Sequence, residues 1–265
     1  MTRRHSVWSG LAVSGAFLIA ACASDASRSE DASAAAAPET ITVFAAASLT
    51  DAFTQIGEDF EAVNEGVTVE FNFGASSDLV DSITGGDALG VADVFASADE
   101  ANMDKLVDAD DNESDPETFA RNQAQIAVPA GNPAGIEGLD DFADDSRFIG
   151  LCAEDVPCGT YAREVLANAG VEPSIDTAEA KVTDVVAKVA SGDLDAGIVY
   201  VTDVLANDDE VDGIEIADEF NVDAIYPIAT VVESGASHTG TAFVDFVLSD
   251  AGQQVLRDFG FLAVS

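Results

Sequence analysis

The sequence predicts an α/β fold built around a mostly parallel sheet. From about residue 40 onward, short runs of β-branched and aromatic residues alternate with longer runs whose apolar residues recur at helical spacing. Strands that alternate with helices of about 10 to 15 residues are typical of βαβ units. No segment repeats along the chain, which excludes a solenoid. With 48% apolar residues, the chain can bury the core of one large domain or of two ordinary ones.

The expected elements are marked by their composition and by the residues that end them. Runs rich in β-formers predict strands at residues 41–44, 67–73, 92–96, 125–128, 148–151, 196–200 and 225–232. Helical spacing predicts helices at residues 49–63, 79–83, 161–169, 182–190, 242–248 and 252–259. Gly85, Pro129 and Gly170 end three of these elements. The acidic or Pro/Gly-rich stretches 108–116 and 131–145 are expected to be surface loops.

The first 21 residues are typical of a secretory signal. Arg3 and Arg4 precede an apolar run over residues 7–21, which is too short to span a bilayer comfortably. The run ends in LIAAC at residues 18–22, which resembles the bacterial lipoprotein cleavage box. We therefore expect Cys22 to carry a lipid anchor. An ordinary signal peptide with an incidental cysteine is the alternative, and Arg3-Arg4 leaves export by the twin-arginine route open.

Residues 22–40 predict a flexible tether. They contain no aromatic and no large aliphatic residue, so they cannot bury enough apolar surface to offset the entropy of ordering. A flexible chain of this length spans roughly 25 Å. The tether would hold the folded body just clear of the outer face of the cytoplasmic membrane, either in a periplasm or at the cell surface.

The charge of the chain is strongly negative. Ten basic residues stand against 50 acidic ones, a formal net charge of −40, and loss of Arg3 and Arg4 with the signal would make it −42. Because like charges repel, nucleic acid and anionic lipid are excluded as partners, and the membrane is met only through the lipid anchor. A solvated, self-repelling surface is favoured over a cation-binding role, since the acidic run 108–115 lacks the glycine and glutamate of a calcium loop.

Cys152 and Cys158 are expected to form a disulfide, because an exported protein meets oxidising conditions and the pair lies six positions apart. Closing this loop would contribute about 2 kcal/mol of stability. His238 is the only histidine of the body, and two cysteines do not complete a zinc shell, so no metal site is expected.

The same sequence pattern occurs at four places in the chain: a strand is expected to end, a small polar residue follows and a helix is expected to begin. They are residues 43–49, 73–79, 156–161 and 183–185. At the first, Ser48 is expected to cap the helix with Asp51 as its capping-box partner. Helix N-termini carry unpaired N–H groups and partial positive charge, so several of them at one cleft form an anion site without lysine or arginine. A plain helix cap is the alternative at each place.

Seven segments in order resemble the molybdate-binding proteins of ABC transporters. They are TVFAAASLT at 42–50, FGASS at 73–77, ADVFASAD at 92–99, VPCGTYA at 156–162, GIVY at 197–200, YPIA at 226–229 and FGF at 259–261. The resemblance covers residues 40–265. It implies a type II periplasmic-binding-protein fold, with two doubly wound α/β lobes, a hinge and a ligand cleft between them. The first lobe would comprise residues 41–123 and 226–265, and the second residues 124–225.

The resemblance also implies a site for a tetrahedral oxyanion held by neutral donors. The hydroxyls would come from Ser48, Ser76 and Tyr200, and the backbone N–H groups from Ser48, Ser76, Cys158 and Val185. The family usually has alanine where Cys158 stands, a change that a backbone donor should survive. Ser77 is a less certain neighbour of this site.

The function that the resemblance implies is that of an extracytoplasmic, monomeric binding protein. It would capture molybdate or tungstate, need no cofactor and deliver its ligand to an ABC permease. A tungstate-selective protein, or one for sulfate or thiosulfate, is the alternative within binding proteins. A serine enzyme would need a base, and the chain offers only His238 and no Ser-x-x-Lys pattern. The sequence therefore favours a binding protein over an enzyme.

Overall fold

A mixed sheet of nine strands runs through residues 39–264, the part of the chain that the computed structural model describes. The expected signal segment 1–21, Cys22 and the tether up to residue 38 lie outside the described residues. The strand order is β2-β1-β3-β9-β4-β7-β5-β6, and β8 pairs with β4. The strands are β1 (Glu39–Ala46), β2 (Val67–Gly74), β3 (Val94–Ala96), β4 (Glu117–Pro129), β5 (Ile149–Cys152), β6 (Thr177–Glu179), β7 (Ala196–Tyr200), β8 (Val211–Ile214) and β9 (Asp223–Thr230).

Eight α-helices flank this sheet in the described residues. They are α1 (Thr50–Val63), α2 (Ser76–Thr84), α3 (Glu100–Asp108), α4 (Pro157–Ala169), α5 (Val182–Ser191), α6 (Val201–Ala206), α7 (Ser237–Leu248) and α8 (Asp250–Asp258). Two 3₁₀ turns, η1 (Ala47–Leu49) and η2 (Leu139–Ala143), complete the structure. None of the helices in this part of the chain has the length and apolar character that crossing a membrane requires.

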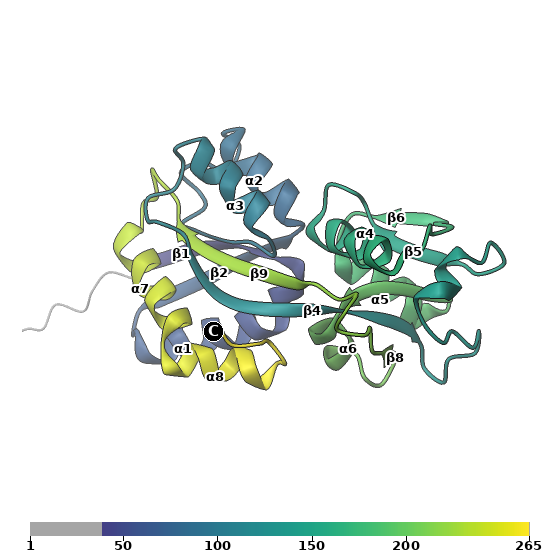
Figure 1. Cartoon of the computed structure of the whole chain (residues 1–265). Helices are drawn as coiled ribbons and strands as arrows, with labels where there is room; N and C mark the ends of the chain where they lie inside the picture. The colour runs from purple at the N-terminus through teal and green to yellow at the C-terminus, as the bar shows by residue number, and fades with distance from the viewer. Residues whose placement is uncertain (1–38, 265) are drawn as a thin grey trace, which may run out of the picture. The chain divides into compact units, whose positions relative to one another are not determined.

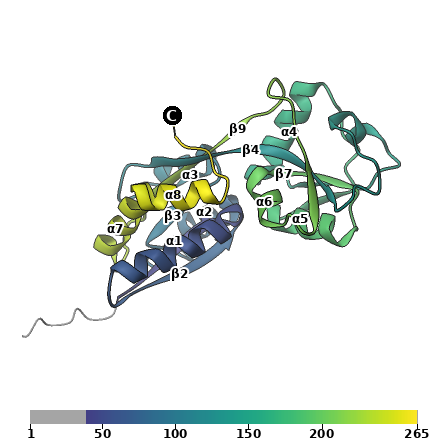
Figure 2. The same cartoon turned by 90° about the horizontal axis from the view of Figure 1, so that it is seen from below.

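The strand β4 passes from one lobe into the other, next to β9, which leads the chain back (Figure 1). In the first lobe, residues 117–123 of β4 pair with β9, and in the second, residues 124–129 pair with β7 and β8. The helices α1, α2, α3, α7 and α8 belong to the first lobe, where α1 and α8 lie side by side (Figure 2). The lobe boundaries expected from the sequence, 41–123 with 226–265 and 124–225, stay a prediction.

The expectation of a mostly parallel sheet is wrong. Four of the eight strand pairings are parallel and four are antiparallel. Every antiparallel pairing involves β4 or β9. The physical reason is that the chain enters the second lobe along β4 and returns to the first along β9. Two neighbouring strands that leave and return must run in opposite directions.

Aromatic residues form the centre of the core in the first lobe. Phe53 packs against Phe119 and Phe243, and Phe60 packs against Phe243, with ring centroids 5.4 to 6.1 Å apart. All four rings are fully buried, and each contributes roughly 1.5 to 3 kcal/mol through its burial. The second lobe has a separate, mainly aliphatic cluster, to which β4, β5 and β7 contribute residues and which also includes Phe142. The cluster around Phe53 extends into the second lobe, where it includes Cys158 and Val182 at the starts of α4 and α5.

Candidate functional site

A small cavity lies where helices of both lobes begin. Its volume is about 20 Å³, which is just above the size that holds one water molecule. The first lobe lines it with η1 and the start of α2, and the second with the starts of α4 and α5 and the end of β7. Four of the residues predicted from the sequence come together here, namely Ser48, Ser76, Cys158 and Tyr200. The cavity therefore brings helix starts from both lobes together around one small space.

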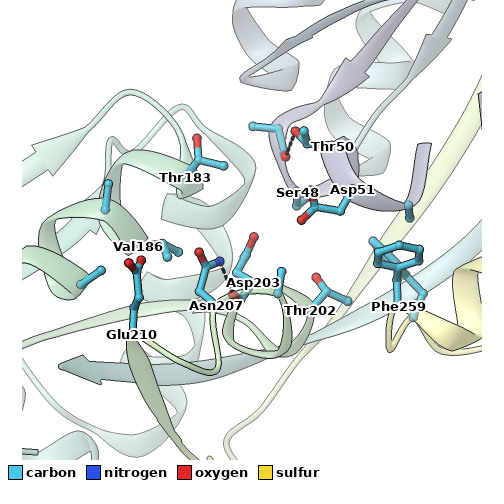
Figure 3. A pocket seen from close by; sticks show the side chains of 16 residues that line it. Ser48, Thr50, Asp51, Thr183, Val186, Thr202, Asp203, Asn207, Glu210 and Phe259 are labelled. Carbon is cyan, nitrogen blue, oxygen red and sulfur yellow. Dashed lines mark hydrogen bonds between the residues drawn. The ribbon is translucent and has the colours of Figure 1, made fainter. Parts of the chain in front are cut away.

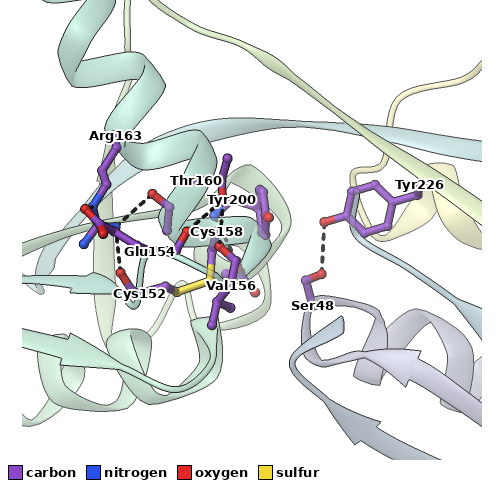
Figure 4. Close-up of a disulfide and its surroundings, with 11 residues drawn as sticks. Ser48, Cys152, Glu154, Val156, Cys158, Thr160, Arg163, Tyr200 and Tyr226 are labelled. Carbon is purple, nitrogen blue, oxygen red and sulfur yellow. Dashed lines mark hydrogen bonds and ion pairs between the residues drawn. A yellow bond between two sulfur atoms is a disulfide. The ribbon is translucent and has the colours of Figure 1, made fainter. Parts of the chain in front are cut away.

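Ser48 lies in the 3₁₀ turn η1 and makes no helix-capping bond. Its Oγ is 3.0 Å from the Oη of Tyr226 (Figure 4). The expected capping box with Asp51 is therefore wrong, because the chain makes a 3₁₀ turn before α1, and Thr50 closes that turn by donating to the carbonyl of Ala47 at 2.7 Å. When Tyr226 donates its hydrogen bond, the hydroxyl hydrogen of Ser48 is free for a ligand.

Ser76 is the first residue of α2 and is almost fully buried, with 1% of its surface exposed. The N–H of Ala98 donates to its Oγ at 3.0 Å. Since this bond uses a lone pair of the oxygen, the hydroxyl hydrogen of Ser76 is also free. The adjacent Ser77 is buried as well, but it does not line the cavity, and its Oγ has no partner among the described residues.

Cys158 lies at the second position of α4, after Pro157. Because proline has no N–H, Cys158 is the first residue of this helix that can donate from its backbone. The expected disulfide to Cys152 is confirmed, with 5.7 Å between the two Cα atoms (Figure 4). Next to it, Gly159 donates to the carbonyl of Val156 at 2.8 Å. The disulfide ties the start of α4 to the end of β5 and so fixes a donor at the cavity.

The start of α5 reaches the cavity through Val182 and not through Val185. Val182 is the first residue of the helix and lines the cavity. Val185 lies one turn further on and is fully buried, and the side chain packs closely against Gly197. The structure therefore does not bring the predicted Val185 together with the other site residues.

Tyr200 ends β7 and has 2% of its surface exposed. Its N–H donates to Oδ2 of Asp203 at 2.9 Å, and its ring packs edge to face on Tyr161 and Tyr226. Burial raises the pKa of the Tyr200 hydroxyl well above its usual range, so it keeps its proton at neutral pH. The Oη has no hydrogen-bond partner among residues 39–264. Leaving such a group unpaired costs about 1 to 3 kcal/mol, which an acceptor on a ligand would relieve.

No acidic residue is among the described residues that line the cavity, although the chain carries 50 of them. Among its described lining residues, Lys181 is the only charged one. The starts of α2, α4 and α5 add the partial positive charge of their unpaired N–H groups. Hydroxyl donors, N–H donors and one lysine together favour a small anion.

A second, larger cavity of about 260 Å³ also has Ser48 in its lining (Figure 3). Asp51 of the first lobe and Asp203 and Glu210 of the second line it. Burial raises the pKa of Asp203 to about 7, although the hydrogen bond from the N–H of Tyr200 lowers it, and the charge of Asp51 raises it further. Three acids make this larger space unsuited to an anion, so the small cavity is the candidate site.

Three residues at or beside the cavity were not predicted from the sequence. Val182 was missed because the search for small polar residues at helix starts selected the neighbouring segment 183–185. Tyr226 belongs to the YPIA segment, but nothing in that segment shows that its hydroxyl faces Ser48. Lys181 carries no signal in the sequence that separates it from a surface lysine.

The family of bacterial extracellular solute-binding proteins matches residues 41–262. The chain belongs to this family. Among relatives of this solute-binding protein, the molybdate-binding protein ModA of Mycobacterium tuberculosis is 38% identical over 259 residues, which are 96% of this chain and 98% of ModA. The family resemblance found in the sequence is thereby confirmed.

Two solved structures show the fold of the solute-binding protein. The periplasmic molybdate-binding protein of Azotobacter vinelandii has a TM-score of 0.71 at 16% identity, and the match covers 85% of this chain and 100% of that one. The sulfate-binding protein SubI of Mycobacterium tuberculosis has a TM-score of 0.77 at 19% identity, with 86% and 88% covered. At these identities the likeness shows the fold alone, and it confirms the expected fold of a periplasmic binding protein.

Proposed function

We propose that this solute-binding protein captures a tetrahedral oxyanion, molybdate or tungstate, in the small cavity and delivers it to an ABC permease. The observation that carries the proposal is the meeting of hydroxyls and helix starts from both lobes in a cavity whose described lining residues include no carboxylate. The 38% identity with a protein named as molybdate-binding supports molybdate as the ligand. A binding role is favoured over an enzymatic one, since no histidine is among the described residues that line the cavity.

The donor set that we propose is neutral. Its hydroxyls are those of Ser48, Ser76 and Tyr200, and its N–H groups are those of Ser48, Ser76, Cys158 and Val182. Val182 takes the place that the sequence prediction gave to Val185, because it lines the cavity and its N–H lies at the open start of α5. A hydrogen bond to a charged group contributes about 1.5 to 3 kcal/mol, so these donors together offset the loss of the hydration shell of the anion. Because they come from both lobes, the bound anion favours the closed arrangement.

Sulfate is the second candidate ligand, because the fold is similar to that of a sulfate-binding protein. Fixed donors discriminate by size, because a smaller tetrahedral anion cannot reach all of them at once. The preference for molybdate over sulfate therefore depends on the rigidity of the helix starts, to which the disulfide at Cys158 contributes.

The location of the protein follows from the same proposal. We propose that the chain is exported, that Cys22 carries the lipid anchor and that the body acts as a monomer outside the cytoplasm. A membrane-tethered body would hold its captured anion near the permease that it feeds.

The first test is a thermal-shift panel with molybdate, tungstate, sulfate and phosphate. An anion present at about 100 times its Kd stabilises the fold by about 2.7 kcal/mol, which raises Tm by roughly 5 to 11 °C for a protein of this size. Molybdate and tungstate should produce this shift, and sulfate and phosphate much less. A panel in which none of the four anions moves Tm would rule the proposal out.

The second test compares neighbouring serines. Ser76→Ala removes a donor at the cavity and should weaken molybdate binding roughly 10- to 100-fold in isothermal titration, the equivalent of one charged hydrogen bond. Ser77→Ala is the matched control, because Ser77 is equally buried and lies outside the cavity. Tyr200→Phe and Tyr161→Phe form a second matched pair. Equal affinities within both pairs would refute the assignment of the site.

A further inference from the structure

Lys181 is the one charged residue among those described at the small cavity. It directly precedes α5, in the N-cap position, and its side chain is half-buried. Its carbonyl accepts a hydrogen bond from the N–H of Asp184 at 3.1 Å, so the backbone that carries it belongs to the ordered first turn of the helix. A cation at this place is not required by a site made of neutral donors.

The ammonium of Lys181 takes part in none of the five ion pairs of the described residues. These pairs are Lys105–Asp81, Arg121–Asp223, Arg147–Asp144, Arg163–Glu154 and Lys188–Glu179. Glu179, only two residues before Lys181, is held by Lys188 at 2.6 Å. In a chain with 50 acidic residues, most cations have an acid within reach. Lys181 is therefore left available for a ligand, and it stands at the cavity where the donors of both lobes meet.

A positive charge at the cavity attracts an anion locally, whereas the net negative charge of the protein repels it. The net charge of −40 creates a field that repels an approaching dianion and slows its capture. Because Lys181 lines the cavity, its single positive charge can act on a ligand there within a Debye length, which is about 8 Å at physiological salt. Coulomb attraction scales with the charge of the ligand, so a dianion gains twice as much from it as a monoanion.

We propose that Lys181 is a charge-selecting residue of this site, which draws divalent oxyanions into the cavity and favours them over monovalent ones of the same shape. The inference rests on the proposed function, because it gives Lys181 a role toward the anion that the neutral donors bind. It adds charge as a basis of selectivity to the size selection that fixed donors provide.

The experiment compares Lys181→Gln with Lys105→Gln in the full-length protein. Both changes remove one positive charge, but Lys105 is on α3, pairs with Asp81 and does not line the cavity. Isothermal titration with molybdate at an ionic strength of about 10 mM, where the Debye length is about 30 Å, should show affinity weakened about 10-fold in Lys181→Gln. The same titration at about 1 M, where that length is about 3 Å, should show much less. Lys105→Gln should change affinity less than about 2-fold at either salt.

Two further measurements distinguish an effect of the charge of Lys181 from an effect of its side chain on the structure. Lys181→Arg keeps the charge and should retain most of the affinity, which a purely structural role of the lysine side chain would not predict. Perrhenate, a tetrahedral monoanion, should lose only about 3-fold where molybdate loses about 10-fold, because its charge is half as large.

The possible failures are distinguishable. If the unaltered protein binds molybdate but Lys181→Gln and Lys105→Gln behave alike, or if molybdate and perrhenate lose affinity equally, the role of Lys181 is refuted and the proposed function stands. If the unaltered protein binds no oxyanion at all, the proposed function falls and this inference falls with it.

Discussion

Replacing Asp203 by asparagine should remove a pH-dependent loss of stability from the protein. Asp203 is 6% exposed, and its Oδ2 accepts the hydrogen bond from the N–H of Tyr200 at 2.9 Å. Burial, with a smaller contribution from the charge of Asp51, raises its pKa from 3.8 to about 7. An asparagine carbonyl can accept the same hydrogen bond without carrying a charge.

The sign of the effect follows from proton linkage. Because the folded state binds this proton more tightly than the unfolded state, the stabilising contribution of Asp203 is complete below about pH 4. It is lost progressively as the pH rises toward 7. A shift of about three pH units at 1.36 kcal/mol each corresponds to about 4 kcal/mol. The free energy of unfolding of the Asp203→Asn variant, relative to that of the unaltered protein, should therefore rise by about 4 kcal/mol between pH 4 and pH 8.

Chemical denaturation at several pH values measures this difference directly. Asp209→Asn is the control for the loss of one negative charge, since Asp209 is an exposed residue of the turn after α6. The many other carboxylates are common to all three proteins and cancel in the comparison. A difference between Asp203→Asn and the unaltered protein that stays constant from pH 4 to pH 8 would refute the reasoning, because it would mean that Asp203 is already ionised in the folded state.

Two further predictions concern the start of α4. Replacing Cys152 and Cys158 together by alanine should lower the free energy of unfolding by about 2 kcal/mol, and a reductant should then no longer lower the Tm, whereas it should do so in the unaltered protein. Gly159→Ala should cost more than Gly235→Ala in thermal unfolding, because a Cβ at Gly159 would overlap the carbonyl oxygen of Ala153 while one at Gly235 meets nothing within 4 Å. Equal Tm values for the two glycine variants would contradict this.

Strand β4, which connects the lobes, could be predicted only in part from the apolar pattern of the sequence. The apolar residues 126–128 predict a strand over 125–128, but β4 begins at Glu117 and passes through Arg121, Asn122 and Gln123. These polar residues lie where the chain crosses between the lobes, and their side chains bond to groups such as Asp223 and Thr202. Apolar periodicity reports burial in a core, and a strand between two cores does not have it.

The helix starts at the cavity could also be predicted only in part from the sequence. The segments around Ser48, Ser76 and Cys158 could be identified because a strand, a small residue and a helix follow one another in sequence, and all three line the cavity. Which residue of a helix start faces a cavity depends on the turn by which the chain enters the helix. The 3₁₀ turn at Ser48 and the position of Val182 both depend on how the chain enters its helix. They cannot be predicted from the residue types alone.

α3 was missed for a different reason. Its nine residues, Glu100–Asp108, place Met103, Leu106 and Val107 at helical spacing, but the pattern covers little more than one turn of a short helix. The signal that could have found it is its cap, since the side chain of Asp99 accepts from the N–H of Asn102. Capping residues thus carry information where an amphipathic pattern is weak.

The acidity of the chain and the anion site that we propose are compatible because they act over different distances. Asp51, Asp203 and Glu210 line the larger cavity, while the described lining of the small cavity has hydroxyls, helix starts and Lys181. Salt screens the distant charges beyond about 8 Å, but it does not weaken hydrogen bonds made in contact with a ligand. The acidity should therefore affect how fast an anion arrives, and the local donors should decide which anion stays. Removing surface acids far from the cavity should raise the association rate at low salt and leave the ranking of molybdate over sulfate unchanged.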